Sequence, residues 1–240
     1  YVRIAAAYIM SANPMIQAFD VNISQAALDD LDYRLRNTRW PLDIHNDDWR
    51  YGFNAKYLKA LTNSWLNDFD WRVIERQINQ FDHYRVELEG DPLHFLHYRS
   101  PEQGAKPLLL TAGWPSTFWD MHKVIEPLAN PRKFGGKASD AFDVVVPSLP
   151  GFGFSTPVQK DYSPTIAADS LHKLMTEVLG YSRYAASGGD LGSRSVLQLG
   201  HKYADKLIGI HVLGATPIDL FNIERYWDCL LYTSDAADES

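Results

Sequence analysis

From Pro107 onward, short apolar segments alternate with longer segments of helical periodicity, and this alternation constrains the fold more than any other feature. The apolar segments are residues 107–111, 142–147, 184–187 and 207–213. The segments between them, in which apolar residues recur every three or four positions, are residues 119–128, 163–180 and 191–203. Strands separated by helices need crossover connections, so the sequence predicts a mostly parallel sheet in a three-layer α/β fold.

Ahead of this region, apolar and polar residues alternate with the period of a strand. Residues 84–88 and 93–98 flank a turn-forming segment at 89–92, which predicts a β-hairpin. His94 and His97 lie in its second strand, but their odd offset puts them on opposite faces. We therefore interpret both histidines as structural residues rather than as ligands of one metal ion.

Three amphipathic helices are predicted before the hairpin. The first begins at Ser24, which can cap it, and ends before Pro41, while the other two follow Asn54 and Asp70. Four tryptophans lie in or between them: Trp40, Trp49, Trp65 and Trp71. Because aromatic residues fall at helical spacing here, we expect these side chains to pack against their neighbours rather than to form a cofactor site.

The composition excludes several classes of partner. The 240 residues are 45% hydrophobic and 22% charged, enough for one sizeable core, and the net charge of −7 argues against nucleic acid. The single cysteine, Cys229, rules out an internal disulfide and fits a reducing compartment. The apolar stretch at residues 4–9 is too short to span a membrane and has no signal-peptide pattern, so we expect a cytoplasmic protein that starts at Met10. The sequence does not support membrane association, and it leaves the oligomeric state open.

Residues 187–193, Ser-Gly-Gly-Asp-Leu-Gly-Ser, join an expected strand to the following helix. A nucleophile at such a sharp turn needs small neighbours, and Gly188, Gly192 and Ser193 surround Asp190. The helix N-terminus favours the ionised carboxylate, which can attack carbon without a base to remove a proton. Asp190 is therefore a candidate nucleophile, although capping a helix in a glycine-rich turn is the commoner role for such an Asp.

Two more loops are expected at the same edge of the sheet. Residues 111–116 (Thr-Ala-Gly-Trp-Pro-Ser) follow one strand, and residues 147–155 (Pro-Ser-Leu-Pro-Gly-Phe-Gly-Phe-Ser) follow the next. Ligands of open α/β sheets bind where the strands end. A Gly-Trp-Pro turn at this edge can aim a backbone N–H at the site.

These three stretches resemble the epoxide hydrolases of the microsomal and juvenile-hormone type, a branch of the α/β-hydrolase superfamily. Residues 112–115 are similar to the family's His-Gly-Trp-Pro loop, and residues 188–192 to its Gly-Gly-Asp-Trp-Gly elbow. The three helices look like the family's N-terminal extension, including the segments at 37–41 and 48–52. By this resemblance, residues 1–18 form an N-terminal segment, residues 19–83 the helical extension and residues 84–228 an incomplete α/β-hydrolase core.

The resemblance implies a reaction and a set of roles. Asp190 would open an epoxide and become a covalent ester, and the backbone N–H groups of Trp114 and Leu191 would form the oxyanion hole when water hydrolyses that ester to a vicinal diol. The implied partners are a small apolar epoxide and water, without a cofactor or a metal. The resemblance also implies a cis bond between Trp114 and Pro115.

Two residues depart from the family's pattern. Ala112 stands where the family usually has His, and Leu191 where it usually has Trp. Because Leu191 would contribute a backbone N–H, the second change should spare the oxyanion hole. Haloalkane dehalogenases share the Asp elbow, but they hold the leaving halide with the indole N–H of a Trp at this position, so a dehalogenase is the weaker alternative.

The family's lid, catalytic acid and catalytic histidine follow the nucleophile, and none is recognised in this sequence. His201 and His211 are predicted inside a helix and a strand, Asp219 is interpreted as a turn residue, and residues 229–240 resemble translated adapter sequence. We therefore expect a C-terminally truncated hydrolase with little turnover, in which residues 207–213 form an exposed apolar edge that favours aggregation. The alternative is a non-catalytic remnant or scaffold that binds apolar ligands.

Overall fold

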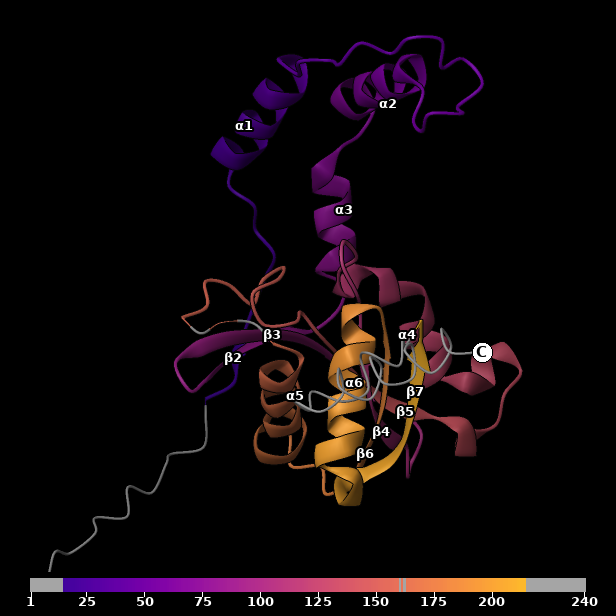
Figure 1. The fold of residues 1–240 in the computed structure, drawn as a ribbon. Coiled ribbons are helices and arrows are strands. Elements are labelled where there is room, and N and C mark those ends of the chain that lie inside the picture. Colours follow the sequence, from indigo (N-terminus) through magenta and orange to yellow (C-terminus); the bar gives the residue numbers. More distant parts are fainter. Residues whose placement is uncertain (1–14, 160, 162, 215–240) are drawn as a thin grey trace, which may run out of the picture. The chain divides into compact units, whose positions relative to one another are not determined.

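The computed structural model describes residues 15–159, 161 and 163–214 (Figure 1). They fall into two compact units: Asp20–Gln80 forms one, and residues 15–19 with the described residues from Phe81 onward form the other. The expectations for Met10, Asp219, Cys229 and residues 229–240 lie outside the described residues.

In the larger unit, the described strands form one seven-stranded mixed sheet with the order β1-β2-β3-β5-β4-β6-β7. The strands are β1 (Gln17–Ala18), β2 (His83–Leu88), β3 (Asp91–Tyr98), β4 (Lys106–Thr111), β5 (Phe142–Pro147), β6 (Tyr184–Gly189) and β7 (Leu207–Leu213). β5, β4, β6 and β7 run parallel, whereas β3 is antiparallel to β5. The carboxyl ends of β4, β5 and β6 therefore meet at one edge of the sheet, as the strand–helix alternation predicts.

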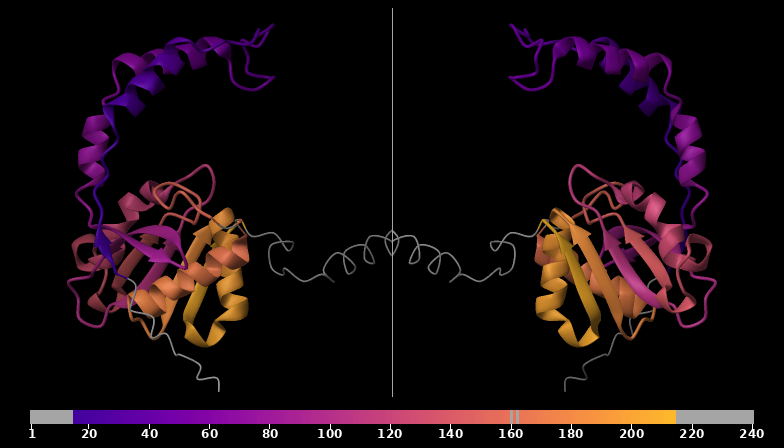
Figure 2. Two further views of the ribbon diagram at one scale, coloured as in Figure 1. Left: turned by 90° about the vertical axis from the view of Figure 1, so that its left-hand side faces the viewer. Right: turned by 90° about the vertical axis from the view of Figure 1, so that its right-hand side faces the viewer.

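Helices cover both faces of this sheet, which confirms the predicted three-layer α/β arrangement. α5 (Pro164–Lys173) and α6 (Leu191–Lys202) lie side by side on one face (Figures 1 and 2), where Leu109, Val145 and Leu199 are fully buried. α4 (His122–Ala129) lies over the other face, near Leu108 and Leu110. Successive side chains of a strand point to opposite faces, so a strand covered on both faces is apolar throughout.

Two of the predicted helices change type along their length. The segment at 119–128 begins as a 3₁₀ helix, η1 (Phe118–Met121), before α4, and the segment at 163–180 continues after α5 as a π-helical turn, η4 (Leu174–Val178). Three short 3₁₀ helices lie in the connections: η2 (Pro131–Phe134), η3 (Ala138–Asp140) and η5 (Ala204–Lys206). Apolar periodicity does not distinguish these forms, because their turns differ by only one residue in the hydrogen-bonding pattern.

The predicted hairpin of β2 and β3 is confirmed, with a shorter turn than expected. Glu89 and Gly90 form the turn, and both have positive φ (55° and 89°), as in the two-residue turns that match the twist of hairpin strands. The sequence did not predict β1, whose two residues pair with Tyr84 and Arg85 of β2. A strand of two residues has no periodicity of its own, and it exists here because β2 offers a free edge.

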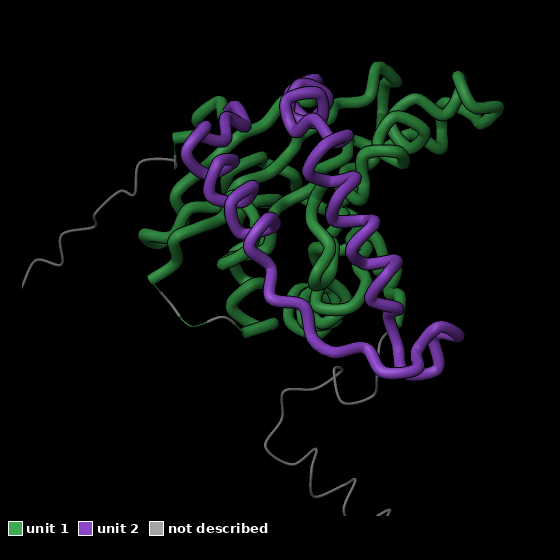
Figure 3. Tube along the Cα trace, turned by 90° about the horizontal axis from the view of Figure 1, so that it is seen from above, with its two compact units in different colours: residues 1–19, 81–240 green, residues 20–80 purple. Residues whose placement is uncertain are grey.

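The smaller unit contains α1 (Gln25–Arg36), α2 (Ala55–Asn67) and α3 (Trp71–Ile78) (Figure 3). The predicted cap at Ser24 is confirmed, and Asn54 and Asp70 cap their helices in the same way: each of the three side chains accepts a backbone N–H from the first turn of the following helix. The caps define where each helix begins without reference to the rest of the fold.

Two side chains at the end of α3 hold the segment that precedes α1. The amide of Asn79 pairs with both the N–H and the C=O of Val21, at 2.9 and 2.8 Å. Glu75 accepts the N–H of Ile23 at 2.7 Å, and this bond together with those from Arg72 lowers the pKa of the Glu75 carboxyl. The unit is thus closed by polar contacts between its two ends.

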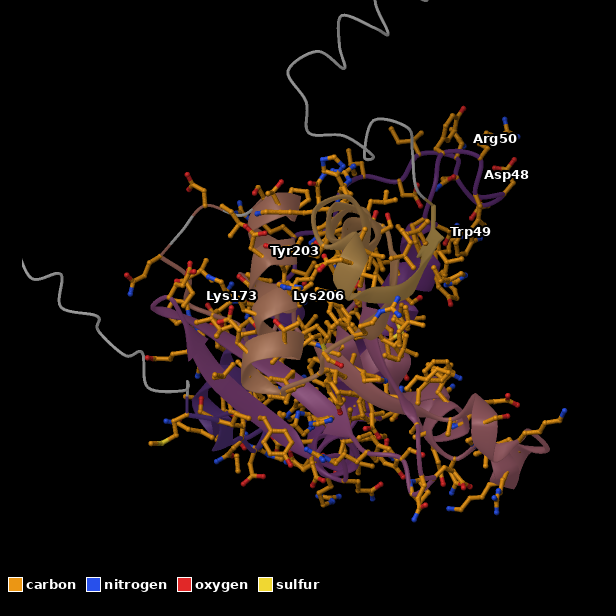
Figure 4. The ribbon with its side chains drawn as sticks, turned by 90° about the horizontal axis from the view of Figure 1, so that it is seen from below. Asp48, Trp49, Arg50, Lys173, Tyr203 and Lys206 are labelled. Atoms are coloured by element: carbon orange, nitrogen blue, oxygen red, sulfur yellow. The ribbon has the colours of Figure 1, made fainter. Side chains whose placement is uncertain are left out.

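Two tryptophans of this unit pack against neighbouring aromatic rings while staying partly exposed. In the described structure, 45% of Trp49 and 46% of Trp65 is exposed. Trp49 lies in the loop between α1 and α2, next to the ion pair of Asp48 and Arg50 (Figure 4), and its ring contacts Tyr57. Helical spacing identifies the apolar face of a helix, but the extent to which that face is covered depends on tertiary packing.

β7 is the last strand of the described sheet. It pairs with β6, and Ile208, Ile210 and Leu213 are between 42% and 60% exposed. Within the described residues, this strand is therefore the exposed apolar edge that the sequence predicts. Aggregation through this edge stays a prediction.

Candidate active site

A single residue, Asp190, connects β6 to α6. Its backbone angles are φ 51° and ψ −121°, a conformation that non-glycine residues rarely adopt and that costs about 1–3 kcal/mol. The turn leaves the Asp190 side chain exposed at the carboxyl end of β6. This strained strand-to-helix connection is the geometry that the small residues around Asp190 predict.

Three glycines allow the backbone to come close to Asp190. A Cβ atom on Gly188 would lie 2.3 Å from Oγ1 of Thr111, and one on Gly192 would lie 2.6 Å from the same oxygen. A Cβ atom on Gly113 would lie 2.4 Å from Cβ of Asp190. The elbow, the turn from β6 to α6 at residues 188–192, therefore packs closely against the end of β4 and the loop that follows. A methyl group does not fit at any of these three glycines.

The carboxylate of Asp190 accepts a backbone N–H group from the loop after β4: Trp114 donates to Oδ1 at 2.9 Å. Leu191, the first residue of α6, carries the next N–H group along the chain. The N–H groups of Trp114 and Leu191, with a smaller effect of the positive charge of Arg194, lower the pKa of the Asp190 carboxyl below its usual value of 3.8. The group is thus a carboxylate at neutral pH and, being exposed, is open to a ligand.

The structure brings together the three residues that the sequence selected, Asp190, Trp114 and Leu191. The bond between Trp114 and Pro115 is cis, as the resemblance implied. The side chain of Trp114 is 66% exposed, so this residue contributes its backbone rather than its ring to the contact with Asp190. Leu191 likewise contributes its N–H, which is independent of the leucine side chain.

The two histidines considered as bases lie away from the carboxylate. His201 is in the last turn of α6, about 15 Å along the helix from its first residue at 1.5 Å per residue. His211 is in β7, where its Nδ1 lies 3.0 Å from Oγ of Ser187, about 10 Å before Asp190 along the strand. Neither position suits a base that acts on an ester of Asp190.

Two loops form a wall beside the carboxylate. The loops that follow β4 and β5 line a cavity of about 20 Å³ with Leu191, and its lining includes Gly113, Ser148 and Phe152. This is room for about one water molecule. The prediction that both loops lie at the same edge of the sheet is therefore confirmed, and Leu191 joins them to the elbow, although neither Asp190 nor Trp114 lines this cavity.

Sequence reasoning identified the loops but missed the side chains that hold them. Thr111 ends β4 and donates its hydroxyl to the carbonyl of Ser187, at 3.1 Å. His94, Ser148 and Ser155 form a buried hydrogen-bond network behind the second loop. Few sequence features mark these residues as supports of the loops: Thr111 ends an apolar strand, and Ser148 and Ser155 lie at the two ends of a glycine-rich loop.

A second cavity lies elsewhere in the larger unit. It measures about 340 Å³ and is lined by the hairpin turn, by Lys173 of α5 and by Tyr203 at the end of α6 (Figure 4). None of Asp190, Trp114 and Leu191 lines it. It is larger than the cavity at the elbow, but its lining does not include the strained carboxylate.

The described residues offer neither a metal-binding cluster nor a membrane-spanning helix. Residues 15–159, 161 and 163–214 contain no group of three His, Cys, Asp or Glu side chains that could hold a metal ion. No helix within these residues is long and apolar enough to cross a bilayer. The cytoplasmic location stays a prediction.

A mixed sheet with a parallel β5-β4-β6-β7 half, whose strand-to-helix elbow presents a strained carboxylate to a backbone N–H, defines an α/β-hydrolase. Accordingly, the family described as alpha/beta hydrolase fold matches residues 106–232, and the family described as epoxide hydrolase N terminus matches residues 16–121. The chain belongs to the epoxide hydrolase family of α/β-hydrolases, as the resemblance of its motifs predicted.

Similar proteins and a solved structure support this family assignment. A protein of Stigmatella aurantiaca (strain DW4/3-1) that carries an epoxide hydrolase name is 43% identical over 198 residues, and epoxide hydrolase 1 of Sus scrofa is 33% identical over 202 residues. Each match covers 82% of this chain but only 45% and 44% of the relative, so the chain spans less than half of their length. The solved structure of Aspergillus niger epoxide hydrolase aligns with a TM-score of 0.75 at 30% identity, over 86% of this chain and 54% of the other.

Proposed function

We propose that this protein acts on a small apolar epoxide with Asp190 as its nucleophile. The observation that carries the proposal is the Asp190 carboxylate, held at a strained elbow by the N–H of Trp114. Because the N–H groups of Trp114 and Leu191 lower the pKa of the carboxyl, it is ionised at neutral pH and needs no base before it attacks. Membership of the epoxide hydrolase family supports the choice of substrate.

In the proposed first step, Oδ2 of Asp190 forms a bond to an epoxide carbon while the bond from that carbon to the epoxide oxygen breaks. The electron pair of the broken bond goes to the epoxide oxygen, which takes a proton from solvent. The product is an ester between Asp190 and a hydroxyalkyl group. The N–H of Trp114 stays on Oδ1 throughout, so the donor is already in place for the next step.

In the second step, a water molecule adds to Cγ of the ester and gives up a proton to solvent, while the electron pair of the Cγ–Oδ1 double bond moves to Oδ1. When this intermediate collapses, the bond between Cγ and Oδ2 breaks, and Oδ2 leaves with the alkyl group, takes a proton and becomes a hydroxyl of the diol. The N–H groups of Trp114 and Leu191 would stabilise the negative charge on Oδ1, which is the role of an oxyanion hole. A base that activates the water is worth about 10²- to 10⁴-fold in rate. Since His201 and His211 lie away from Asp190, we propose that the 240-residue chain accumulates the ester rather than releasing diol quickly.

The test is to incubate the 240-residue chain with styrene oxide and to locate the adduct by peptide mass spectrometry. We expect one hydroxyalkyl group per chain, on the peptide that contains Asp190, and none in Asp190→Asn. Asp169→Asn, which changes a carboxylate on α5 that is paired with Lys202, is the matched control and should be alkylated like the parent chain.

Two outcomes would contradict the proposal. One is an adduct that forms equally in Asp190→Asn, and the other is release of diol without any ester on Asp190. A chain that binds the epoxide saturably without forming a covalent bond would instead support the non-catalytic scaffold.

A further inference from the structure

We propose that His94 is a positioning residue for the Asp190 site, because its buried ring joins the two loops beside the carboxylate and so keeps the N–H of Trp114 aimed at Oδ1. The inference rests on the proposed function for its importance to catalysis. Its main test, however, is the NMR signal of the Trp114 backbone amide, which can be recorded without an epoxide.

His94 holds the loop after β5 through its side chain and its backbone. Its Nδ1 lies 2.9 Å from Oγ of Ser148, and its C=O accepts the N–H of Ser148 at 2.9 Å. Its N–H donates to Oγ of Ser155 at 2.9 Å, and that hydroxyl in turn donates to the C=O of Ser148 at 2.8 Å. Both ends of the loop are therefore fixed to one residue of β3.

The same ring contacts the continuation of the loop after β4. The centroid of the Phe118 ring lies 4.9 Å from that of His94 in an edge-on arrangement. Phe118 begins η1, four residues after Trp114, and it lines the 20 Å³ cavity together with Ser148 and Leu191. A displacement of the His94 ring would therefore disturb both loops that form this wall.

The environment fixes the hydrogen-bonding pattern of the ring. His94 is fully buried, and its Nε2 lies 2.9 Å from Nδ1 of His83. Burial, followed by the charges of His83 and Arg85, lowers the pKa of His94 to about 3, so the ring is neutral near pH 7. A neutral imidazole has one donor and one acceptor, and Ser148 and His83 occupy one each.

His97 provides a matched comparison within the same strand. It is also buried, and its Nε2 bonds to the hydroxyl of Tyr181 at 2.9 Å, which in turn donates to Asp143 at 3.1 Å. Neither His97 nor Tyr181 lines the cavity at the elbow. Replacement of His97 should thus cost stability without reaching Trp114.

The experiment is 1H–15N NMR at pH 7 on the 240-residue chain, in which the tryptophans carry 15N. It records the backbone amide signals of these residues. Trp114→Phe identifies the Trp114 amide signal by its loss, and Asp190→Asn gives the position of that signal without the bond to a charged acceptor. We expect His94→Phe and Ser148→Ala to change the chemical shift of the Trp114 amide proton by at least half of the change that Asp190→Asn causes. His97→Phe should leave it at the position of the parent chain.

Ser148→Ala keeps the test decisive if His94→Phe does not fold, because it removes one hydroxyl and leaves the ring in place. An unmoved Trp114 signal in folded Ser148→Ala would overturn the proposal, and so would an equal movement in His97→Phe. We also expect alkylation by styrene oxide to slow about tenfold in His94→Phe, since misplaced groups lose rate steeply. If no variant is alkylated, the proposed function fails while the amide signal still decides the role of His94.

Discussion

Oδ1 of Asp190 lies 2.9 Å from the backbone nitrogen of Trp114, a residue 76 positions earlier in the chain. This contact unites the elbow after β6 with the loop after β4, and Gly113 permits it by leaving out a Cβ atom. A backbone donor is fixed by the fold and does not reorganise as charge develops. The site therefore depends on the positions of main-chain groups. Substitutions at the residues that fix these positions should change its stability or its reactivity.

The strain at Asp190 should appear as an inverted preference between glycine and alanine. In most positions Ala is more stable than Gly by about 0.5–1 kcal/mol. At φ 51° and ψ −121° we expect Asp190→Gly to unfold with a free energy about 1 kcal/mol higher than Asp190→Ala, because only glycine is relaxed there. Urea denaturation of the two variants measures the difference. If Ala is the more stable variant, the elbow is not strained.

The two consecutive glycines of β6 should respond differently to a methyl group. A Cβ on Gly188 would lie 2.3 Å from Oγ1 of Thr111, whereas one on Gly189 would lie 3.7 Å from Leu213, an ordinary contact. We expect Gly188→Ala to lower the free energy of unfolding by about 3 kcal/mol and Gly189→Ala to change it by less than about 1 kcal/mol. Equal losses measured by urea denaturation would show that the elbow is not packed against β4.

Gly113→Ala should impair the chemistry. Its Cβ would lie 2.4 Å from Cβ of Asp190, so the loop must move away and take the N–H of Trp114 with it. We expect alkylation by styrene oxide to slow about 100-fold, as a displacement of about 1 Å can cost. Gly209→Ala, where no atom lies within 4 Å of the new methyl, is the control and should react like the parent chain. An unchanged rate in Gly113→Ala would mean that the Trp114 contact is dispensable.

Leu191→Trp restores the side chain that the family usually has, and it should leave the reactivity of Asp190 nearly unchanged. The residue's contribution to the carboxylate is its N–H, which the substitution keeps. We therefore expect the rate of alkylation at pH 7 to change by less than about threefold, since the N–H that stabilises the carboxylate remains. A change of tenfold or more, measured by the time course of the Asp190 adduct, would assign the role to the side chain.

The larger unit should lose stability in mild acid. Burial lowers the pKa of His94 to about 3 and that of His97 to about 4, from 6.5 in the unfolded chain, and burial lowers that of His172 as well. The unfolded state thus binds more protons below pH 6.5, so the free energy of unfolding falls as the pH drops. The loss should be about 1 kcal/mol each for His94 and His97 between pH 7 and pH 5.5.

Urea denaturation at the two pH values measures this loss, and His97→Asn should remove about 1 kcal/mol of it. The substitution deletes one titrating group while leaving His94 in place. A free energy of unfolding that is the same at pH 7 and pH 5.5 would contradict the burial of neutral histidines.

The local sequence determined where the first three helices begin and that the chain turns sharply at Asp190. Ser24, Asn54 and Asp70 define their helices because a capping side chain bonds to N–H groups only two or three residues away. Likewise, the small residues around Asp190 predict a sharp turn from their own sterics. These features depend on neighbours in the chain, so they can be read without the fold.

Tertiary structure decided what those elements contact. The strand order that places β4 between β5 and β6 brings Thr111 against Gly188 and Trp114 against Asp190, and no local pattern encodes such pairings. The same holds for β1, and for the ring of His94, whose partner Ser148 lies 54 residues away. The sequence by itself determined the nucleophile candidate and its turn, whereas the contact of Trp114 with Asp190 and the loop supports follow from long-range packing, which has no short-range signature.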